Sequence, residues 1–105
     1  PHKVRQALLR RHAVVLLFYS DAGADDRAVH SEVAAVSRRG GRVNAWSVPV
    51  SGLSRFKNVL AGVQILQTPA VLILSPRGRP PVLLNGYTDV AEIDQITAAA
   101  LRKPR

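Results

Sequence analysis

The sequence predicts a single α/β domain of three layers, in which helices flank a mixed four-stranded sheet. Residues 13 to 19 form an unbroken apolar run that breaks into a short acidic turn, after which the pattern becomes helical. Residues 70 to 74 and 81 to 85 are two short apolar runs joined by the turn sequence Ser-Pro-Arg-Gly-Arg, which is typical of a hairpin. Because a strand–helix–strand unit makes parallel strands and a hairpin makes antiparallel ones, we expect a mixed sheet.

The length and composition fit one folded domain. The chain has 105 residues, and we expect the domain to span residues 1 to 105, with an extra N-terminal helix at 1 to 12 and a core at 13 to 103. The apolar fraction of 47% supports a packed interior, and the charged fraction of 21% argues against a disordered chain.

The chain begins with a helical pattern followed by a buried strand. Residues 2 to 11 place Val4, Ala7 and Leu8 on one helical face, with basic residues around the other. We expect this helix to cover the strand at residues 13 to 20, which is apolar on both faces and therefore central in the sheet.

A second helix and a second strand complete the first half. Asp25 and Asp26 are good N-cap and first-turn residues, and the helix is expected to run to about Arg39, where Gly40-Gly41 ends it. Residues 42 to 50 then form the second strand, with Pro49 near its end.

The second half is expected to contain a helix, a hairpin and a final helix. Residues 53 to 63 carry an apolar stripe at helical spacing, and residues 64 to 68 connect this helix to the hairpin. Gly86 ends the fourth strand, and Thr88 or Asp89 caps a last helix that runs to Leu101.

Two bulk features limit the chemistry. The sequence contains no cysteine, so disulfides, thiolate metal sites and thiol catalysis by these residues are excluded. The net charge of +8 suits an anionic partner such as an acidic protein, an anionic membrane surface or nucleic acid, although basic ends that are merely solvated explain it as well. Aromatic side chains are not interleaved with the basic ones, so no specific nucleic-acid site is predicted. The basic residues at the two ends are Lys3, Arg5, Arg10, Arg11, Arg102, Lys103 and Arg105.

The localisation stays open. No apolar run approaches the roughly 20 residues that span a bilayer, and no signal-peptide pattern is visible. The first residue is Pro and not Met, which leaves room for an upstream signal or membrane anchor. The soluble domain of a longer bacterial protein, membrane-anchored or secreted, is one alternative.

From Ala13 to Leu101 the chain resembles thioredoxin-fold domains. The resemblance is carried by Val-Leu-Leu-Phe-Tyr-Ser at residues 15 to 20, by the helix start near Asp26-Arg27, by Ile-Leu-Gln-Thr-Pro-Ala-Val-Leu-Ile-Leu at residues 65 to 74, and by Gly86. It implies a thioredoxin-like three-layer sandwich and a cis peptide bond before Pro69. It also implies that an extended polypeptide docks by backbone pairing at Thr68, beside the first loop.

The departures from this family decide the expected activity. Gly23-Ala24-Asp25-Asp26 stands where the family has Cys-X-X-Cys, and Leu17 stands where it has a buried acidic residue. Gln64 stands where a Gly usually precedes the cis-proline segment. A carboxylate cannot replace a thiolate in disulfide exchange, so the resemblance implies a redox-inactive member that is not a dithiol enzyme and needs no cofactor.

The acidic loop allows a second interpretation. Asp21, Asp25 and Asp26 lie within six residues, with His30 one helical turn after Asp26, and carboxylate oxygens are ligands for hard divalent cations. The competing interpretation is that Asp21 starts the turn, Asp25 or Asp26 caps the helix, and His30 pairs with Asp26. We favour the second interpretation and predict no metal site.

We therefore expect a redox-inactive binding or scaffolding module for a protein or peptide partner. The alternatives are a metal-dependent enzyme at the acidic loop and a basic adaptor to an anionic membrane or nucleic acid. The expected binding surface consists of the degenerate loop and the proline edge: Asp21, Gly23, Asp25, Asp26, Thr68, Pro69 and Tyr87.

Overall fold

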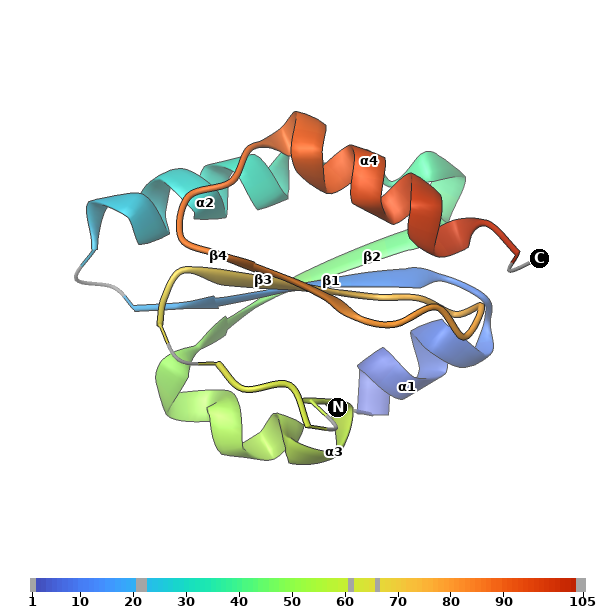
Figure 1. The fold of residues 1–105 in the computed structure, drawn as a ribbon, viewed down its shortest axis with the longest axis horizontal. Coiled ribbons are helices and arrows are strands. Elements are labelled where there is room, and N and C mark those ends of the chain that lie inside the picture. The colour runs from blue at the N-terminus through green and yellow to red at the C-terminus, as the bar shows by residue number, and fades with distance from the viewer. Residues whose placement is uncertain (1, 21–22, 61, 66, 104–105) are drawn as a thin grey trace.

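The computed structural model describes residues 2–20, 23–60, 62–65 and 67–103. Figure 1 shows a sheet in the middle, with α2 (Ala24–Ala34) and α4 (Val90–Leu101) over one face and α1 (His2–Leu9) and α3 (Lys57–Leu60) under the other. This three-layer arrangement confirms the predicted α/β architecture. No helix in the described parts of the chain is long and apolar enough to cross a membrane.

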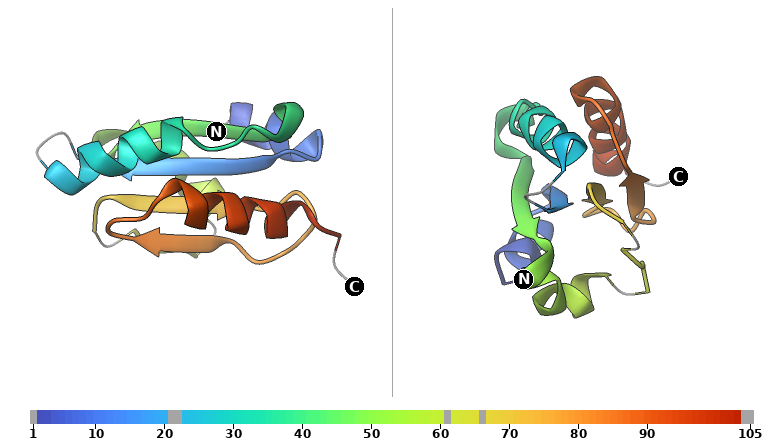
Figure 2. Two further views of the ribbon diagram at one scale, coloured as in Figure 1. Left: turned by 90° about the horizontal axis from the view of Figure 1, so that it is seen from above. Right: turned by 90° about the vertical axis from the view of Figure 1, so that its left-hand side faces the viewer.

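The sheet is mixed and four-stranded, as predicted. Its strands are β1 (Ala13–Tyr19), β2 (Val43–Pro49), β3 (Ala70–Leu74) and β4 (Val82–Asn85), in the order β2-β1-β3-β4. β1 pairs parallel with β2, whereas β3 pairs antiparallel with both β1 and β4. Two views of the same ribbon show that β2 and β4 lie at opposite edges (Figure 2).

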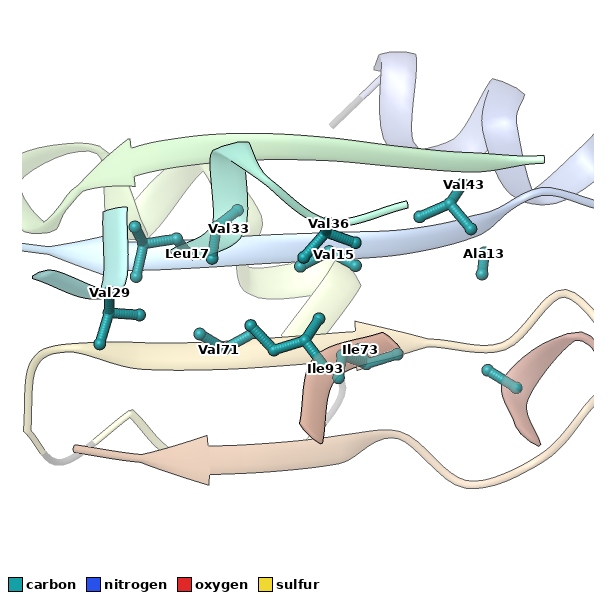
Figure 3. Close-up of a cluster of buried hydrophobic side chains, with 11 residues drawn as sticks. Ala13, Val15, Leu17, Val29, Val33, Val36, Val43, Val71, Ile73 and Ile93 are labelled. Carbon is teal, nitrogen blue, oxygen red and sulfur yellow. The ribbon is translucent and has the colours of Figure 1, made fainter. Parts of the chain in front are cut away.

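β1 is buried on both faces, and its alternating side chains build two separate cores. Val15 and Leu17 point toward α2 and α4, where they pack with Val29, Val33 and Ile93. Figure 3 shows the side chains of this cluster gathered around β1 and β3. The sheet is therefore held from the side of α2 and α4 by a continuous apolar layer.

The opposite face of β1 packs on α1 and on the segment after β2. Val14, Leu16 and Phe18 belong to a second cluster that includes Val4 of α1 and Phe56 of the 3₁₀ helix η2 (Val50–Phe56). The rings of Phe18 and Phe56 meet edge to face, with centroids 5.9 Å apart. The N-terminal helix therefore covers the sheet, as its apolar stripe predicts.

The prediction that the helix after the acidic loop continues to Arg39 is wrong. α2 ends at Ala34, and a separate 3₁₀ turn, η1 (Arg39–Gly41), precedes β2. The physical reason is a contact with α4: the Ser37 amide donates to Asp94 Oδ1 at 3.0 Å, and Arg39 Nη2 donates to the Asp94 carbonyl at 3.1 Å. These bonds hold the chain out of the helical path, although Val36 still packs in the core.

The predicted helix at residues 53 to 63 is also wrong in form. The segment is η2 followed by the single α-helical turn α3. Gly52, a poor helix former, lies within η2. The apolar stripe still reaches the core, since Leu53, Leu60 and Val63 pack against the second cluster.

A pair of leucines tests the central position of β1. We expect Leu17→Ala to lower the free energy of unfolding by about 2–5 kcal/mol, because Leu17 is fully buried between β1 and α2. Leu9→Ala is the matched control: Leu9 is 77% exposed, so its loss should change the free energy by less than about 0.5 kcal/mol. Urea unfolding followed by circular dichroism measures both, and equal effects would contradict the assignment of Leu17 to the core.

Candidate functional site

Four chain segments meet at one end of the sheet. β1 and β4 finish there, and α2 and β3 begin there, on the left of Figure 1. Phe18 is opposite Ala70, and Ala70 is opposite Asn85, so Tyr19, Pro69 and Gly86 continue this row. The Gly86 amide donates to the Pro69 carbonyl at 2.8 Å. The fold thus brings the segment before α2 to the same end of the molecule as Thr68-Pro69.

Asp26 is a buried carboxylate that closes the end of β1. Its side chain is 6% exposed, and Oδ2 accepts a hydrogen bond from the Ser20 amide at 2.7 Å. The expectation that Asp25 or Asp26 is the N-cap of α2 is wrong, because Gly23 occupies the N-cap position and α2 begins at Ala24. Asp26 lies in the first turn, where the helix dipole favours a negative charge, while its carboxylate is directed at the preceding strand.

Gly23 leaves the space that Asp26 occupies. Its backbone is extended, with φ −95° and ψ 140°, so any residue could adopt this conformation. A Cβ atom at position 23 would, however, overlap Asp26 Oδ1. The neighbouring carboxylate, and not the backbone angles, therefore disfavours a larger residue at position 23. Positions 23 and 26 are thus in direct steric contact.

A shallow hollow lies beside Asp26. It has a volume of about 250 Å³ and is lined by Tyr19, Ser20, Asp26, Arg27 and His30. The ring of His30 contacts that of Tyr19 edge to face, with centroids 5.8 Å apart. Among the described residues His30 makes no hydrogen bond or ion pair with Asp26, so the predicted pairing of the two is wrong. Tyr19 and Ser20 were not predicted as site residues. Their position at the end of the apolar run, directly before the acidic turn, is the signal that could have identified them.

The acidic loop gives little support to a metal site. Asp21 lies outside the described residues, Asp25 is exposed, and Asp26 uses one oxygen to accept the Ser20 amide. In the parts of the chain that the structure describes, no three His, Cys, Asp or Glu side chains come together. The donor set shown here is therefore poor for a divalent cation, which takes six or more oxygen ligands.

The proline edge has backbone groups that are unpaired within the part of the chain that the structure describes. The Thr68–Pro69 peptide bond is cis, Pro69 is buried and Thr68 is half-buried. Within the described ranges, neither the amide nor the carbonyl of Thr68 has a hydrogen-bond partner. Tyr87, one residue beyond Gly86, is 59% exposed. The exposed Tyr87 therefore directly follows Gly86, whose amide binds the Pro69 carbonyl.

The coupling of positions 23 and 26 is testable by a double-mutant cycle. We expect Gly23→Ala to destabilise the fold by about 1–3 kcal/mol, because the new methyl group forces the Asp26 carboxylate away from Ser20. In an Asp26→Ala background the same change should cost at least about 1 kcal/mol less. Thermal and urea unfolding of the four proteins measure this coupling.

Asp25→Ala is the matched control for Asp26→Ala. Asp25 is exposed, so its loss removes only an interaction with the helix dipole and should cost less than about 1 kcal/mol. Additive effects of Gly23→Ala and Asp26→Ala would show that the two residues do not constrain each other.

Comparisons with known proteins identify the fold. No protein-family model matches the chain, and no curated protein has a matching sequence. Solved structures do match it. Chloroplastic thioredoxin z is 20% identical with a TM-score of 0.70, over 94% of this chain and 88% of that one. Thioredoxin O2 from Arabidopsis thaliana is 16% identical with a TM-score of 0.65, over 96% and 89%. Trxlp from Edwardsiella tarda is 13% identical with a TM-score of 0.66, over 91% of each chain.

At these identities the likeness establishes the fold alone: the chain has the thioredoxin-like fold and, having no cysteine, lacks the Cys-X-X-Cys pair.

Proposed function

We propose that this chain is a redox-inactive thioredoxin-like module that binds an extended segment of a protein or peptide partner. The observation that carries the proposal is that the amide and carbonyl of Thr68, beside Pro69 at the end of the sheet, have no hydrogen-bond partner among the described residues. The proposed binding surface includes Asp21, Gly23, Asp25, Asp26, Thr68, Pro69 and Tyr87.

The chemistry of the loop favours binding over catalysis. Disulfide exchange needs a thiolate that attacks a sulfur atom, and this sequence supplies none. Asp26 occupies the position of one missing thiol, but it is buried and accepts the Ser20 amide. A carboxylate held in this way connects the first turn of α2 to the end of β1.

The backbone of Thr68 is suited to an extended partner. A peptide that lies along this edge can donate to the Thr68 carbonyl and accept from the Thr68 amide, as in strand addition. Tyr87 follows Gly86, which binds the Pro69 carbonyl, and supplies a large exposed ring; tyrosine is common among side chains that dominate binding energies. Asp25 adds an exposed negative charge to the same end of the molecule, which favours a basic residue in the partner.

Random peptides displayed on phage test the binding surface. We expect selection on the folded protein to enrich peptides that shift the amide NMR signals of Thr68, Gly86, Tyr87 and Ser20. Tyr87→Ala should weaken the selected peptides by about tenfold, since an interface aromatic typically contributes over 1 kcal/mol. Leu9→Ala removes another exposed apolar side chain, at 77% exposure, and should leave their affinity unchanged. Failure to enrich any peptide, or shifts confined to other surfaces, would contradict the proposal.

The redox-inactive state has its own test. We expect the pure protein not to accelerate the reduction of insulin disulfides by dithiothreitol, because the chain has no thiol. Gly23→Cys/Asp26→Cys restores two thiols at the start of α2 while removing the carboxylate that would overlap the first. This variant serves as the positive comparison. Turnover by the unmodified protein would refute the assignment.

A further inference from the structure

The free edge of β2 exposes backbone groups on the opposite side of β1 from β3 and Pro69. The Ala13 amide donates to the Arg42 carbonyl at 2.8 Å, so the even-numbered residues of β2 direct their backbone groups toward β1. The Val43 amide points the other way, to the Arg38 carbonyl at 3.1 Å. It follows that the amides and carbonyls of Ala45 and Ser47 face outward. In the described part of the chain they have no hydrogen-bond partner there.

This free edge is short and has defined ends. The Arg38 carbonyl already occupies the Val43 amide, and Pro49 has no amide to offer. Edge strands that are shortened in this way are protected against unspecific sheet extension. The open stretch at Ala45 and Ser47 is suited to a short peptide segment and not to a long second sheet.

A basic trough runs beside this edge on the side of α1. Two hollows of about 530 and 270 Å³ share Lys3 and Trp46 and lie between α1, β2 and η2. Figure 2 shows α1 lying under β2 in the right-hand view. The charged and titratable side chains that line the two hollows are His2, Lys3, Arg10, His12 and Arg55. No acidic side chain is among the lining residues.

Trp46 and Arg55 are positioned by their surroundings. Trp46 is half-buried and packs against the second core cluster, so its indole forms a fixed wall of the trough. A Cβ atom on the buried Gly52 would lie 2.8 Å from Arg55 Nη2, which shows that the guanidinium lies directly over that glycine. At the other end of the trough, His12 Nδ1 and Asn44 Oδ1 are hydrogen-bonded at 2.9 Å.

The distribution of charge along the chain reinforces the trough. All seven acidic residues fall between 21 and 32 or between 89 and 94. The described acidic residues therefore belong to α2, to α4 and to the N-cap of α4, on the far face of the sheet. α1 and β2 contain no acidic residue, so the charged side chains on this face are cations, which favours a negatively charged partner.

We propose that this trough and the free edge of β2 bind an acidic polypeptide segment in extended form. The segment pairs with the backbone of Ala45 and Ser47, and its alternate side chains extend over the trough toward Lys3, Arg55 and Trp46. A polypeptide is favoured over a nucleic acid for two reasons. Outward-facing amides and carbonyls match another peptide backbone, and a single half-buried indole does not form the series of stacking platforms that bases use. This interaction is separate from the one proposed at Pro69.

The only tryptophan of the chain reports binding directly. Trp46 lies in the trough, so its fluorescence can follow a titration without a label. The probe is a blocked peptide of about ten alternating Glu and Val residues, which places acidic side chains on one face of an extended strand. We expect saturable fluorescence changes that weaken as the salt concentration rises.

Charge-reversal variants locate the site. Lys3→Glu/Arg55→Glu should lower the affinity for the peptide at least about tenfold, because both cations line the trough. Arg102→Glu/Lys103→Glu carries the same change in net charge at exposed positions beyond α4 and should lower it less than about twofold at physiological salt. Circular dichroism of each variant verifies that the fold is retained.

Four outcomes would overturn the proposal. The first is the absence of a saturable signal, and the second is an equal loss in both charge-reversal variants. The third is a tighter complex with a thymidine oligonucleotide of equal charge, which would indicate a phosphate-binding surface. Methylation of every backbone nitrogen of the peptide should abolish binding, and unchanged affinity would likewise refute strand pairing. Tyr87→Ala should leave this titration unchanged, so failure here and failure of the Pro69 site are distinguishable.

Discussion

β1 lies in the centre of the sheet with its first six residues fully buried, and this double burial constrains the rest of the molecule. Its backbone groups cannot reach water, so they must be paired within the protein. β2 pairs with one side and β3 with the other. Its side chains need an apolar layer on each face, which α2 and α4 supply on one side and α1 and η2 on the other. At the end of the strand Asp26 supplies an acceptor for the Ser20 amide.

The contact between Asp26 and Ser20 gives the start of α2 a structural role that does not depend on thiols. A buried carboxylate is costly unless it is hydrogen-bonded. Asp26 meets this requirement through the Ser20 amide and through its place in the first turn of α2. Its position requires a residue without Cβ at Gly23. A side chain at position 23 would displace the Asp26 carboxylate as it stands, whereas a shorter uncharged residue at position 26 would remove this conflict.

The strands were predictable because burial fixes their pattern locally. The apolar runs and the hairpin turn place all four strands to within about one residue at most ends. Helix ends depended on distant residues instead. α2 stops early because Asp94, on α4, accepts the Ser37 amide, and no local pattern indicates that bond. The role of Asp26 was missed for a similar reason: an aspartate near a helix start suggests a cap, whereas its partner is Ser20, the residue that follows β1. The basic trough combines residues of α1, β2 and η2, so only the fold reveals it.

The separation of charge gives the two proposed surfaces different selectivity. The net charge of +8 is a sum over surfaces of different sign. The first turn of α2 contains two aspartates, whereas the charged side chains that line the trough beside α1 and β2 are all basic. Like charges that come close during docking cost energy, so charge selects against wrong partners as well as for right ones. We expect the cations beside β2 to attract an acidic segment and the exposed Asp25 in the first turn of α2 to repel it. Because the two edges lie on opposite sides of β1, a partner at one need not displace a partner at the other. A thioredoxin-like fold without thiols could in this way hold two different chains at once, which a redox enzyme with a single reactive loop does not require.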